Sequence, residues 1–365
     1  MCSNCIGIRE LRRTDRTGDT GLLMESMART HSNDAKQSGS GSLKFIFLFG
    51  LIAFILLGLT ATGLRPLLAR DDSQRASGIA AASPFDGDRA YEMLARICAF
   101  GPRPPASESL RQTRSLILES LEDVGLKTRV HEFEADTPIG QVEMVNVVGE
   151  ISGSTPGIIV ISGHYDTKHM DDIRFLGAND GGASAAWLIE FARAVGPKRE
   201  GRTIWLVFYD GEEAYGEWSG TNGIFGSRAF VEHLKETGEI DRVDAALNVD
   251  MIGDCYLGVQ RDTAAPTWMQ TAVWGKAVEL KYEGHFLNSG SAITDDHIPF
   301  RLAGVPAMNL IDFQYGGSTV DHQRNWHTEE DTLDKCCAES LQVVGDVVYH
   351  ALSTLETYLD AGLRN

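Results

Sequence analysis

The sequence has few cysteines, and they are scattered. Six occur in 365 residues: Cys2, Cys5, Cys98, Cys255, Cys336 and Cys337. They are too few and too dispersed for a disulfide scaffold in a chain of this length, so the fold needs a hydrophobic core. Cys2 and Cys5 have C-x-x-C spacing but no second pair or histidine near them, and we interpret them as incidental. Adjacent Cys336 and Cys337 cannot easily bond to each other, and core packing is their expected role.

Positive charge is also scarce. The chain has 33 Lys and Arg against 51 Asp and Glu, which gives a formal net charge of −18 at pH 7. Such a chain repels phosphate backbones, so we expect no nucleic-acid partner, whereas cationic peptides would be attracted weakly and in a salt-dependent way. With 43% hydrophobic and 23% charged residues, the composition is otherwise that of a globular protein.

One segment departs from this globular composition. Residues 45–64 read FIFLFGLIAFILLGLTATGL, without a charge, between Lys44 and Arg65. A run of this length spans a bilayer as a helix, whereas a cleaved signal peptide would be shorter and nearer the start. We therefore expect an uncleaved single-pass anchor in a membrane. Basic residues balance on its two sides, so the positive-inside rule does not orient it. Since a long domain behind such an anchor is commonly translocated, we expect a periplasmic, luminal or extracellular domain.

The remaining chain divides by composition. Residues 1–44 are polar, mixed in charge and end in SGSGS, which predicts a disordered tail. Residues 65–85 are again polar and rich in Ala and Ser, as in a linker. No internal repeat is visible, so residues 86–365 are expected to form a single domain, the one that carries the chemistry.

Hydrophobic periodicity predicts the elements of this domain. Apolar residues at helical spacing predict helices over residues 89–100, 108–124, 183–195, 227–235, 266–280 and 338–359. Continuous apolar runs between polar residues predict buried strands over residues 157–162, 203–209, 245–251 and 305–311. This alternation indicates an α/β fold with a single open, mostly parallel twisted sheet covered by helices on both faces. Ligands of such sheets collect at the carboxyl ends of the strands.

Ionisable residues lie at the carboxyl ends of three of the predicted strands. The segments IVISGHYD, WLVFYDGEE and NVDMIGD contribute these side chains: His164, Asp166, Asp210, Glu212, Glu213, Asp250 and Asp254. A lone aspartate at a strand end usually caps a helix or forms a turn. Several converging on one edge of a sheet instead favour a chemical role.

A bound metal ion would compensate the negative charge of these groups. Carboxylates and imidazoles gathered in a cleft need a compensating cation, and zinc accepts mixed oxygen and nitrogen ligands. The candidate ligands are His164, Asp180, Glu213, Asp250 and His327. One carboxylate of the pair Glu212 and Glu213 can ligate the metal while its neighbour carries a proton. A solvated turn is the alternative for such a pair, but this one directly follows a buried strand.

A family resemblance rests on eight motifs spread over most of residues 90–360. They are GHYDT, GANDGGASAAWLIEFAR, FYDGEEAYGEW, IFGSR, NVDMIG, DDHIPF, AGVPAMNLI and WHTEEDT, in this order. Together they resemble the animal-type zinc-dependent glutaminyl cyclases, which are similar in fold to two-zinc aminopeptidases. The resemblance implies conversion of an N-terminal glutamine of peptides or proteins to pyroglutamate, with release of ammonia.

The resemblance also implies a ligand set. It places the family's single zinc on Asp180, Glu213 and His327, which leaves the fourth coordination position open. His164, Asp180 and Asp250 are the residues that a second zinc would use in the aminopeptidases. The cyclases keep these residues while binding one zinc, so one Zn²⁺ is expected and two are possible.

The other site residues follow from the same resemblance. Glu212 would be the proton carrier, with Asp250 and Asp295 hydrogen-bonding around the reaction centre. Trp218 and Trp326 would line the pocket for the glutamine side chain, although core packing is the ordinary role of a tryptophan.

Three functions remain open at this stage. The long loop AYGEWSGTNGIFGSR and the aspartate pair of DDHIPF favour the cyclase. A zinc aminopeptidase that hydrolyses N-terminal residues is the second hypothesis, and a non-catalytic, membrane-tethered peptide-binding domain is the third. Gly163 stands where secreted animal cyclases have a cysteine, so their nearby disulfide is not expected here.

Overall fold

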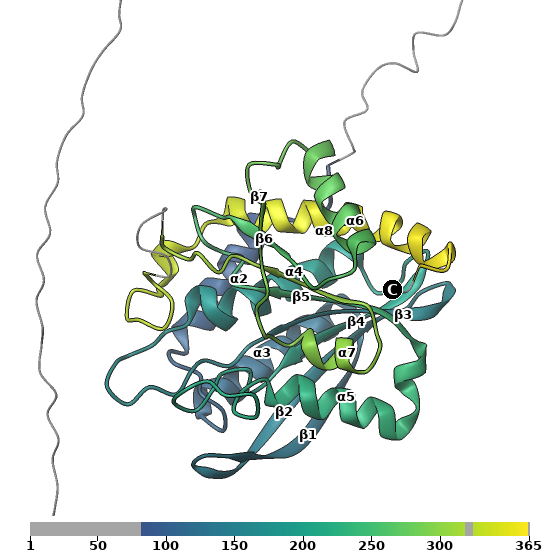
Figure 1. The fold of residues 1–365 in the computed structure, drawn as a ribbon. Helices are drawn as coiled ribbons and strands as arrows, with labels where there is room; N and C mark the ends of the chain where they lie inside the picture. Colours follow the sequence, from purple (N-terminus) through teal and green to yellow (C-terminus); the bar gives the residue numbers. More distant parts are fainter. Residues whose placement is uncertain (1–81, 318–323, 364–365) are drawn as a thin grey trace, which may run out of the picture. The chain divides into compact units, whose positions relative to one another are not determined.

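The computed structural model describes residues 82–317 and 324–363, which are coloured in Figure 1. The expected tail (1–44), membrane span (45–64) and most of the linker (65–85) lie outside these residues. Within the two described ranges, no helix is both long and apolar enough to cross a membrane.

The centre of the fold is a mixed sheet. Six strands of the described chain pair in the order β1-β2-β4-β3-β5-β8. Their bounds are β1 Lys127–Thr137, β2 Gly140–Ile151, β3 Thr155–His164, β4 Arg202–Tyr209, β5 Val243–Asp250 and β8 Ala307–Ile311. The pairs β4/β3, β3/β5 and β5/β8 are parallel, whereas β1/β2 and β2/β4 are antiparallel. The expected mostly parallel sheet is therefore confirmed for the strands that precede the site residues.

The hairpin of β1 and β2 was missed by the sequence analysis. β1 pairs only with β2 in this sheet, and all but one of its 11 residues are exposed or half-buried. An edge strand with little burial has no continuous apolar run, so periodicity does not reveal it. A small second sheet, β6 Val259–Asp262 with β7 Phe286–Ser291, was missed as well.

The helices of the described chain are α2 Gly87–Ala99, α3 Glu108–Val124, α4 Ser184–Val195, α5 Phe225–Thr237, α6 Thr267–Glu279, the short α7 Ile298–Leu302 and α8 Ala338–Asp360. Six helices agree with their predicted positions to within two residues, whereas the short helix α7 was not predicted. The side chain of Asp86 accepts a hydrogen bond from the Arg89 amide, and that of Ser107 accepts one from the Leu110 amide. Each satisfies an amide that a helix start otherwise leaves unpaired, which is why α2 and α3 begin there.

Helices cover both faces of the sheet, as expected (Figure 1). Ile159 and Ile161 of β3 belong to the larger core, which includes α2, α4 and α8. The alternate residues Ile158 and Val160 belong to a second core with Phe230 of α5. Since neighbouring side chains of a strand point to opposite faces, the continuous apolar run of β3 reflects burial on both.

A disulfide bond joins Cys255, in the loop after β5, to Cys337, which directly precedes α8. The core-packing role expected for Cys337 is therefore wrong, while Cys336 is a buried free thiol as expected. The partners are 82 residues apart. They meet because the Cys255 amide bonds to the Lys335 carbonyl and the Cys337 amide to the Gly253 carbonyl. The residues around Cys255 and Cys337 in the sequence did not indicate that these two cysteines pair.

Candidate active site

The strands β3, β4, β5 and β8 run parallel, so their carboxyl ends share one edge of the sheet. A cavity of about 470 Å³ opens there. Of the nine predicted site residues, eight line this cavity: Asp180, Glu212, Glu213, Trp218, Asp250, Asp295, Trp326 and His327. The ninth, His164, is buried at the end of β3. The structure thus brings together side chains that are up to 163 residues apart in the sequence.

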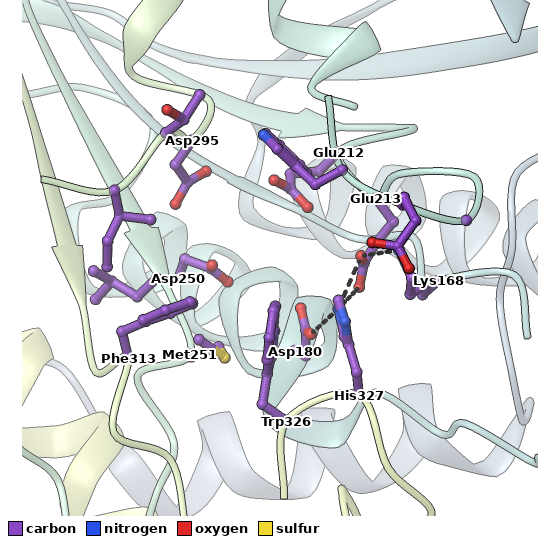
Figure 2. A pocket seen from close by; sticks show the side chains of 16 residues that line it. Lys168, Asp180, Glu212, Glu213, Asp250, Met251, Asp295, Phe313, Trp326 and His327 are labelled. Atoms are coloured by element: carbon purple, nitrogen blue, oxygen red, sulfur yellow. Dashed lines mark hydrogen bonds and ion pairs between the residues drawn. The ribbon is translucent and has the colours of Figure 1, made fainter. Parts of the chain in front are cut away.

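Asp180, Glu213 and His327 form the first group of possible metal ligands (Figure 2). One ligand atom from each lies within 4.8 Å of the others. His327 Nε2 is 3.1 Å from Glu213 Oε2 and 3.4 Å from Asp180 Oδ2. Asp180 Oδ2 is buried and accepts no hydrogen bond within the described residues. Two buried carboxylates and an imidazole, with one carboxylate oxygen that accepts no hydrogen bond, fit a zinc ion.

His164, Asp180 and Asp250 form a second group with the same spacing. His164 Nε2 lies 3.1 Å from Asp180 Oδ1 and 3.2 Å from Asp250 Oδ1. The two groups share Asp180, so the site offers two neighbouring sets of ligand side chains with one residue in common.

Asp180 is positioned by an irregular turn. It lies in a short π-helical segment, η2 Ala178–Ala183, with non-helical torsions at Asp180 and Gly181. Gly181 has φ +85°, and a Cβ there would lie 2.3 Å from the Asp166 carbonyl oxygen, so only glycine fits. Beneath the turn, the Asp331 carboxylate accepts the amides of Asn179 and Asp180 at 2.8 and 3.1 Å.

The two glutamates are held by their backbone. β4 ends in a turn at Gly211, which has φ +71°. The Asp166 carboxylate then accepts hydrogen bonds from the amides of Glu212 and Glu213, at 3.2 and 3.4 Å, and lies 3.3 Å from His164 Nδ1. This one carboxylate therefore couples the end of β3 to the glutamate pair.

Glu212 and Glu213 have different surroundings. Glu213 contacts His327, whereas Glu212 points to the part of the cavity where Asp295 and Asp250 lie (Figure 2). Burial raises the pKa of Glu212 well above its usual range, and the nearby negative charge of Asp295 adds to this effect. A buried carboxyl group with a raised pKa can hold and return a proton near neutral pH.

Asp295 is fixed by a row of polar side chains that crosses the sheet. Asn248 of β5 and Asn309 of β8 are register partners, and both donate to the Asp295 carboxylate, at 3.1 and 2.6 Å. The Asp296 amide donates to the same carboxylate. Further along the row, Ser162 of β3 donates to Asn248 Oδ1 at 2.9 Å. Because all of these groups are buried, their hydrogen bonds hold one arrangement.

The cavity has one aromatic and one acidic side. Trp326 stacks on His327 with ring centroids 3.9 Å apart. Phe313 packs edge-on against Trp326, with ring centroids 5.2 Å apart. Trp218 is 45% exposed at the cavity mouth. Within the described chain, Lys168 is the only Lys or Arg that lines the cavity, and its Nζ lies 3.8 Å from Glu213 Oε2.

Sequence reasoning missed several residues that support the site: Lys168, Asn248, Asn309 and Asp331. It placed Asp166 among the ionisable residues at the strand ends but assigned it no role in the site. Lys168 directly follows GHYDT and Asp331 stands in WHTEEDT, within a few positions of predicted ligands, so proximity in a motif could have drawn attention to them. Asn248 and Asn309 give no such signal. Their role depends on the β5/β8 register, which the sequence does not specify.

This fold, with two groups of ligand residues at the carboxyl edge of its sheet, defines the class of zinc-exopeptidase-like α/β proteins. A solved Zn-dependent exopeptidase from Parabacteroides distasonis has the same fold, with a TM-score of 0.67 and 24% identity over 73% of this chain and 98% of that chain. A family model described as Peptidase family M28 matches residues 146–352.

Two glutaminyl cyclases are similar to this chain over two thirds or more of its length. The glutaminyl-peptide cyclotransferase of Drosophila melanogaster is 26% identical over 272 residues, which cover 67% of this chain and 75% of the relative. The crystal structure of an Acidobacteriales bacterium glutaminyl cyclase matches with a TM-score of 0.71 and 34% identity, over 77% of this chain and 98% of that chain. The chain therefore belongs to peptidase family M28 and, within it, to the glutaminyl cyclases.

Proposed function

We propose that the chain is a zinc-dependent glutaminyl-peptide cyclotransferase, which converts the N-terminal glutamine of peptides or proteins to pyroglutamate and releases ammonia. The observation that carries this function is the position of Glu212. It is a buried carboxyl group that lies in the same cavity as the ligand group of Asp180, Glu213 and His327 and is not itself a member of that group. A site of this kind offers both a metal and a separate proton carrier.

The reaction is an acyl transfer within one molecule. The α-amine nitrogen bonds to the side-chain amide carbon, the bond from that carbon to the amide nitrogen breaks, and one proton must pass from the first nitrogen to the second. Glu212 would take this proton and return it, which its buried position permits. No water is consumed in this reaction, which distinguishes it from hydrolysis.

One zinc ion fits the first ligand group. Asp180, Glu213 and His327 would hold it through two carboxylates and an imidazole, with a position left for the substrate. When bound, the ion supplies Lewis-acid polarisation of the amide carbonyl and stabilises negative charge on its oxygen. Lys168 limits the repulsion among the acidic groups, since its ammonium lies 3.8 Å from Glu213 Oε2.

The aromatic side of the cavity would hold the glutamine side chain. Trp326 is fixed between His327 and Phe313, and Trp218 stands across the mouth. Flat apolar walls that pack against the methylene groups of the glutamine side chain favour the folded shape in which the α-amine and the amide carbon approach each other. Asp250 and Asp295 would hydrogen-bond the amine end, because acidic groups attract an ammonium or accept from an amine.

Incubation with two peptides tests the function directly. A peptide that begins with glutamine should lose one ammonia, acquire a blocked amino terminus and keep all of its residues, as read by mass spectrometry. A peptide of the same sequence that begins with leucine should stay unchanged. Shortening of either peptide by one residue, without formation of pyroglutamate, contradicts the proposal.

Hydrolysis of N-terminal residues is the second candidate function. The group His164, Asp180 and Asp250 favours it, because these side chains could hold a second ion beside the first. Release of free leucine from the control peptide, together with two bound zinc ions per chain, would support this alternative. Neither result is expected for the cyclase.

We also propose that residues 45–64 anchor the chain in a membrane and that the catalytic domain faces the periplasm, lumen or exterior. The Cys255–Cys337 disulfide supports this side, because disulfides form and persist in oxidising compartments. Protease added to intact cells or sealed vesicles should digest the domain. Complete protection, with digestion only after lysis, contradicts this orientation.

A further inference from the structure

Trp218 is carried by a loop with little core of its own. The loop runs from Tyr215 to Gly223, between the glutamate pair and α5, and residues 216–221 are all exposed. An exposed segment of this kind ordinarily samples many conformations, and ordering it costs about 1–2 kcal/mol per residue. A tryptophan on such a loop would contact substrate weakly unless something fixes it in advance.

The base of the loop is fixed to the glutamate segment. The Ile224 amide donates to the Glu212 carbonyl at 2.7 Å, and the Phe225 amide donates to the Gly211 carbonyl at 2.8 Å. The segments directly before and after the loop are therefore joined through the backbone of Glu212, the proposed proton carrier. Movement at the base would disturb Glu212 itself.

Asn222 closes the loop from within. Its side chain is buried, with 8% exposure, although residues 216–221, directly before it, are exposed. Oδ1 accepts the Tyr215 amide at 3.2 Å, and Nδ2 donates to the carbonyls of Tyr215 and Glu217 at 2.7 and 2.9 Å. One amide side chain thus satisfies three backbone groups and fixes the residue directly before Trp218.

Gly223 supplies the surface on which Trp218 rests. A Cβ at Gly223 would lie 2.6 Å from Cζ3 and 2.9 Å from Cη2 of Trp218, so the ring is packed against the glycine α-carbon. Gly223 also has φ +142°, where residues with a side chain are strained. Gly220, three residues earlier in the same loop, has open space around the corresponding position.

We propose that Asn222 and Gly223 are positioning residues that hold the Trp218 ring across the mouth of the cavity before substrate arrives. Asn222 fixes the path of the loop, and Gly223 leaves the space that the ring occupies. This inference rests on the proposed function, because its consequence is stronger binding of the substrate's glutamine residue. A preorganised ring saves the ordering cost at the moment of binding, so the effect belongs to KM and not to proton transfer.

The central experiment compares two glycines of one loop. Gly223→Ala should raise KM for a glutamine peptide roughly tenfold, with kcat within about twofold of the wild type. The matched control, Gly220→Ala, should leave both constants unchanged, since its added methyl group meets no atom within 4 Å. Zinc content of both variants should equal that of the wild type. Gly220→Ala should also keep its melting temperature, whereas Gly223→Ala should melt at a lower temperature because alanine is strained at φ +142°.

A double variant tests whether the effect of Gly223→Ala on KM depends on the Trp218 ring. In Trp218→Ala protein the ring is gone, so adding Gly223→Ala should raise KM by less than about twofold. If the full effect of Gly223→Ala persists without the ring, it arises from backbone strain and the inference is overturned. It is equally overturned if Gly223→Ala and Gly220→Ala behave alike in an active enzyme.

Asn222→Asp provides an independent variant if Gly223→Ala fails to fold. Aspartate keeps the oxygen that accepts the Tyr215 amide but directs a carboxylate at two carbonyls. KM should rise with kcat preserved, again only when Trp218 is present, and an unchanged KM contradicts the inference. If the proposed function itself were wrong, the wild-type protein would form no pyroglutamate from a glutamine peptide, which is a different result.

Discussion

The side-chain amide of Asn309 donates a hydrogen bond of 2.6 Å to Oδ2 of Asp295. Both side chains are buried, and Asp295 lines the cavity opposite the metal-ligand group. Asn309→Ala would leave a buried carboxylate oxygen without this donor, at a cost of about 1–3 kcal/mol. Asp295 would then turn toward other donors, and we expect kcat for glutamine peptides to fall roughly 10- to 100-fold while bound zinc is retained.

Ser162→Ala is the matched control for this prediction. Ser162 lies at the far end of the same polar row and contacts Asn248, not Asp295. Its removal should change kcat by less than about threefold. Equal losses in the two variants would indicate that the row acts only on stability, which thermal unfolding of both proteins measures.

Glu212 and Glu213 should have separable roles, although they are adjacent. Glu212→Gln keeps volume and hydrogen bonding but cannot carry a proton, so zinc and substrate binding should persist while turnover falls by about 10² to 10⁴. Glu213→Gln should instead weaken zinc binding, because its carboxylate faces His327 at 3.1 Å. Zinc analysis and steady-state kinetics on the two variants decide the matter. Loss of zinc in Glu212→Gln would contradict the assignment.

The fold could be predicted where sequence pattern and burial coincide. His164 and Asp250 are the last residues of β3 and β5, and Glu213 lies four residues after the end of β4. The apolar runs therefore indicated that these side chains share an edge of the sheet. The polar edge strand β1 had no such run. For the same reason periodicity gave nothing about the β6/β7 sheet.

The supporting contacts of the site could not be predicted, because they depend on register and loop path. Asn248 and Asn309 become neighbours only when β5 and β8 pair in one register. Cys255 and Cys337 are neighbours because the start of α8 lies beside the loop that follows β5. Asn222 sits in a Gly-rich loop, where an asparagine ordinarily indicates a turn and nothing more.

Metal content distinguishes the two ligand groups. Purified protein should contain about one zinc per chain. His327→Ala should lose both metal and activity, whereas His164→Ala should keep most of its metal, because His164 belongs only to the second group. His285→Ala, a histidine outside both groups, serves as the control. A second zinc that disappears in His164→Ala would favour the aminopeptidase function.

The disulfide should contribute strongly to stability. It closes a loop of 82 residues, for which the chain-entropy relation gives about 4.5 kcal/mol. Replacing both Cys255 and Cys337 with serine should therefore lower the melting temperature while zinc binding remains. Reductant should destabilise the wild type to a similar extent and have no further effect on the double variant. An additional effect on the double variant would mean that another group is being reduced.

His131 should make stability depend on pH. Its Nδ1 lies 3.2 Å from Asn146 Nδ2, so a neutral ring accepts this hydrogen bond and a protonated ring cannot. The ring also stacks on His233 at 4.8 Å between centroids. Burial, with His233 and Arg129 nearby, lowers the pKa of His131 to about 4. The unfolded chain, with a histidine pKa of about 6.5, binds the proton more readily.

The sign of the effect follows from that difference. His131 contributes its full stability above about pH 6.5 and loses it as the pH falls toward 4, because protons then favour the unfolded state. Since His131 is only half-buried, we discount the contribution to about 1 kcal/mol, or roughly 2–4 °C in melting temperature.

His131→Gln keeps an acceptor but cannot titrate, so between about pH 7 and pH 5 its melting temperature should fall less than that of the wild type. His169→Gln, at an exposed position, should follow the wild type. Equal losses in wild type and His131→Gln would show that other groups control the pH dependence.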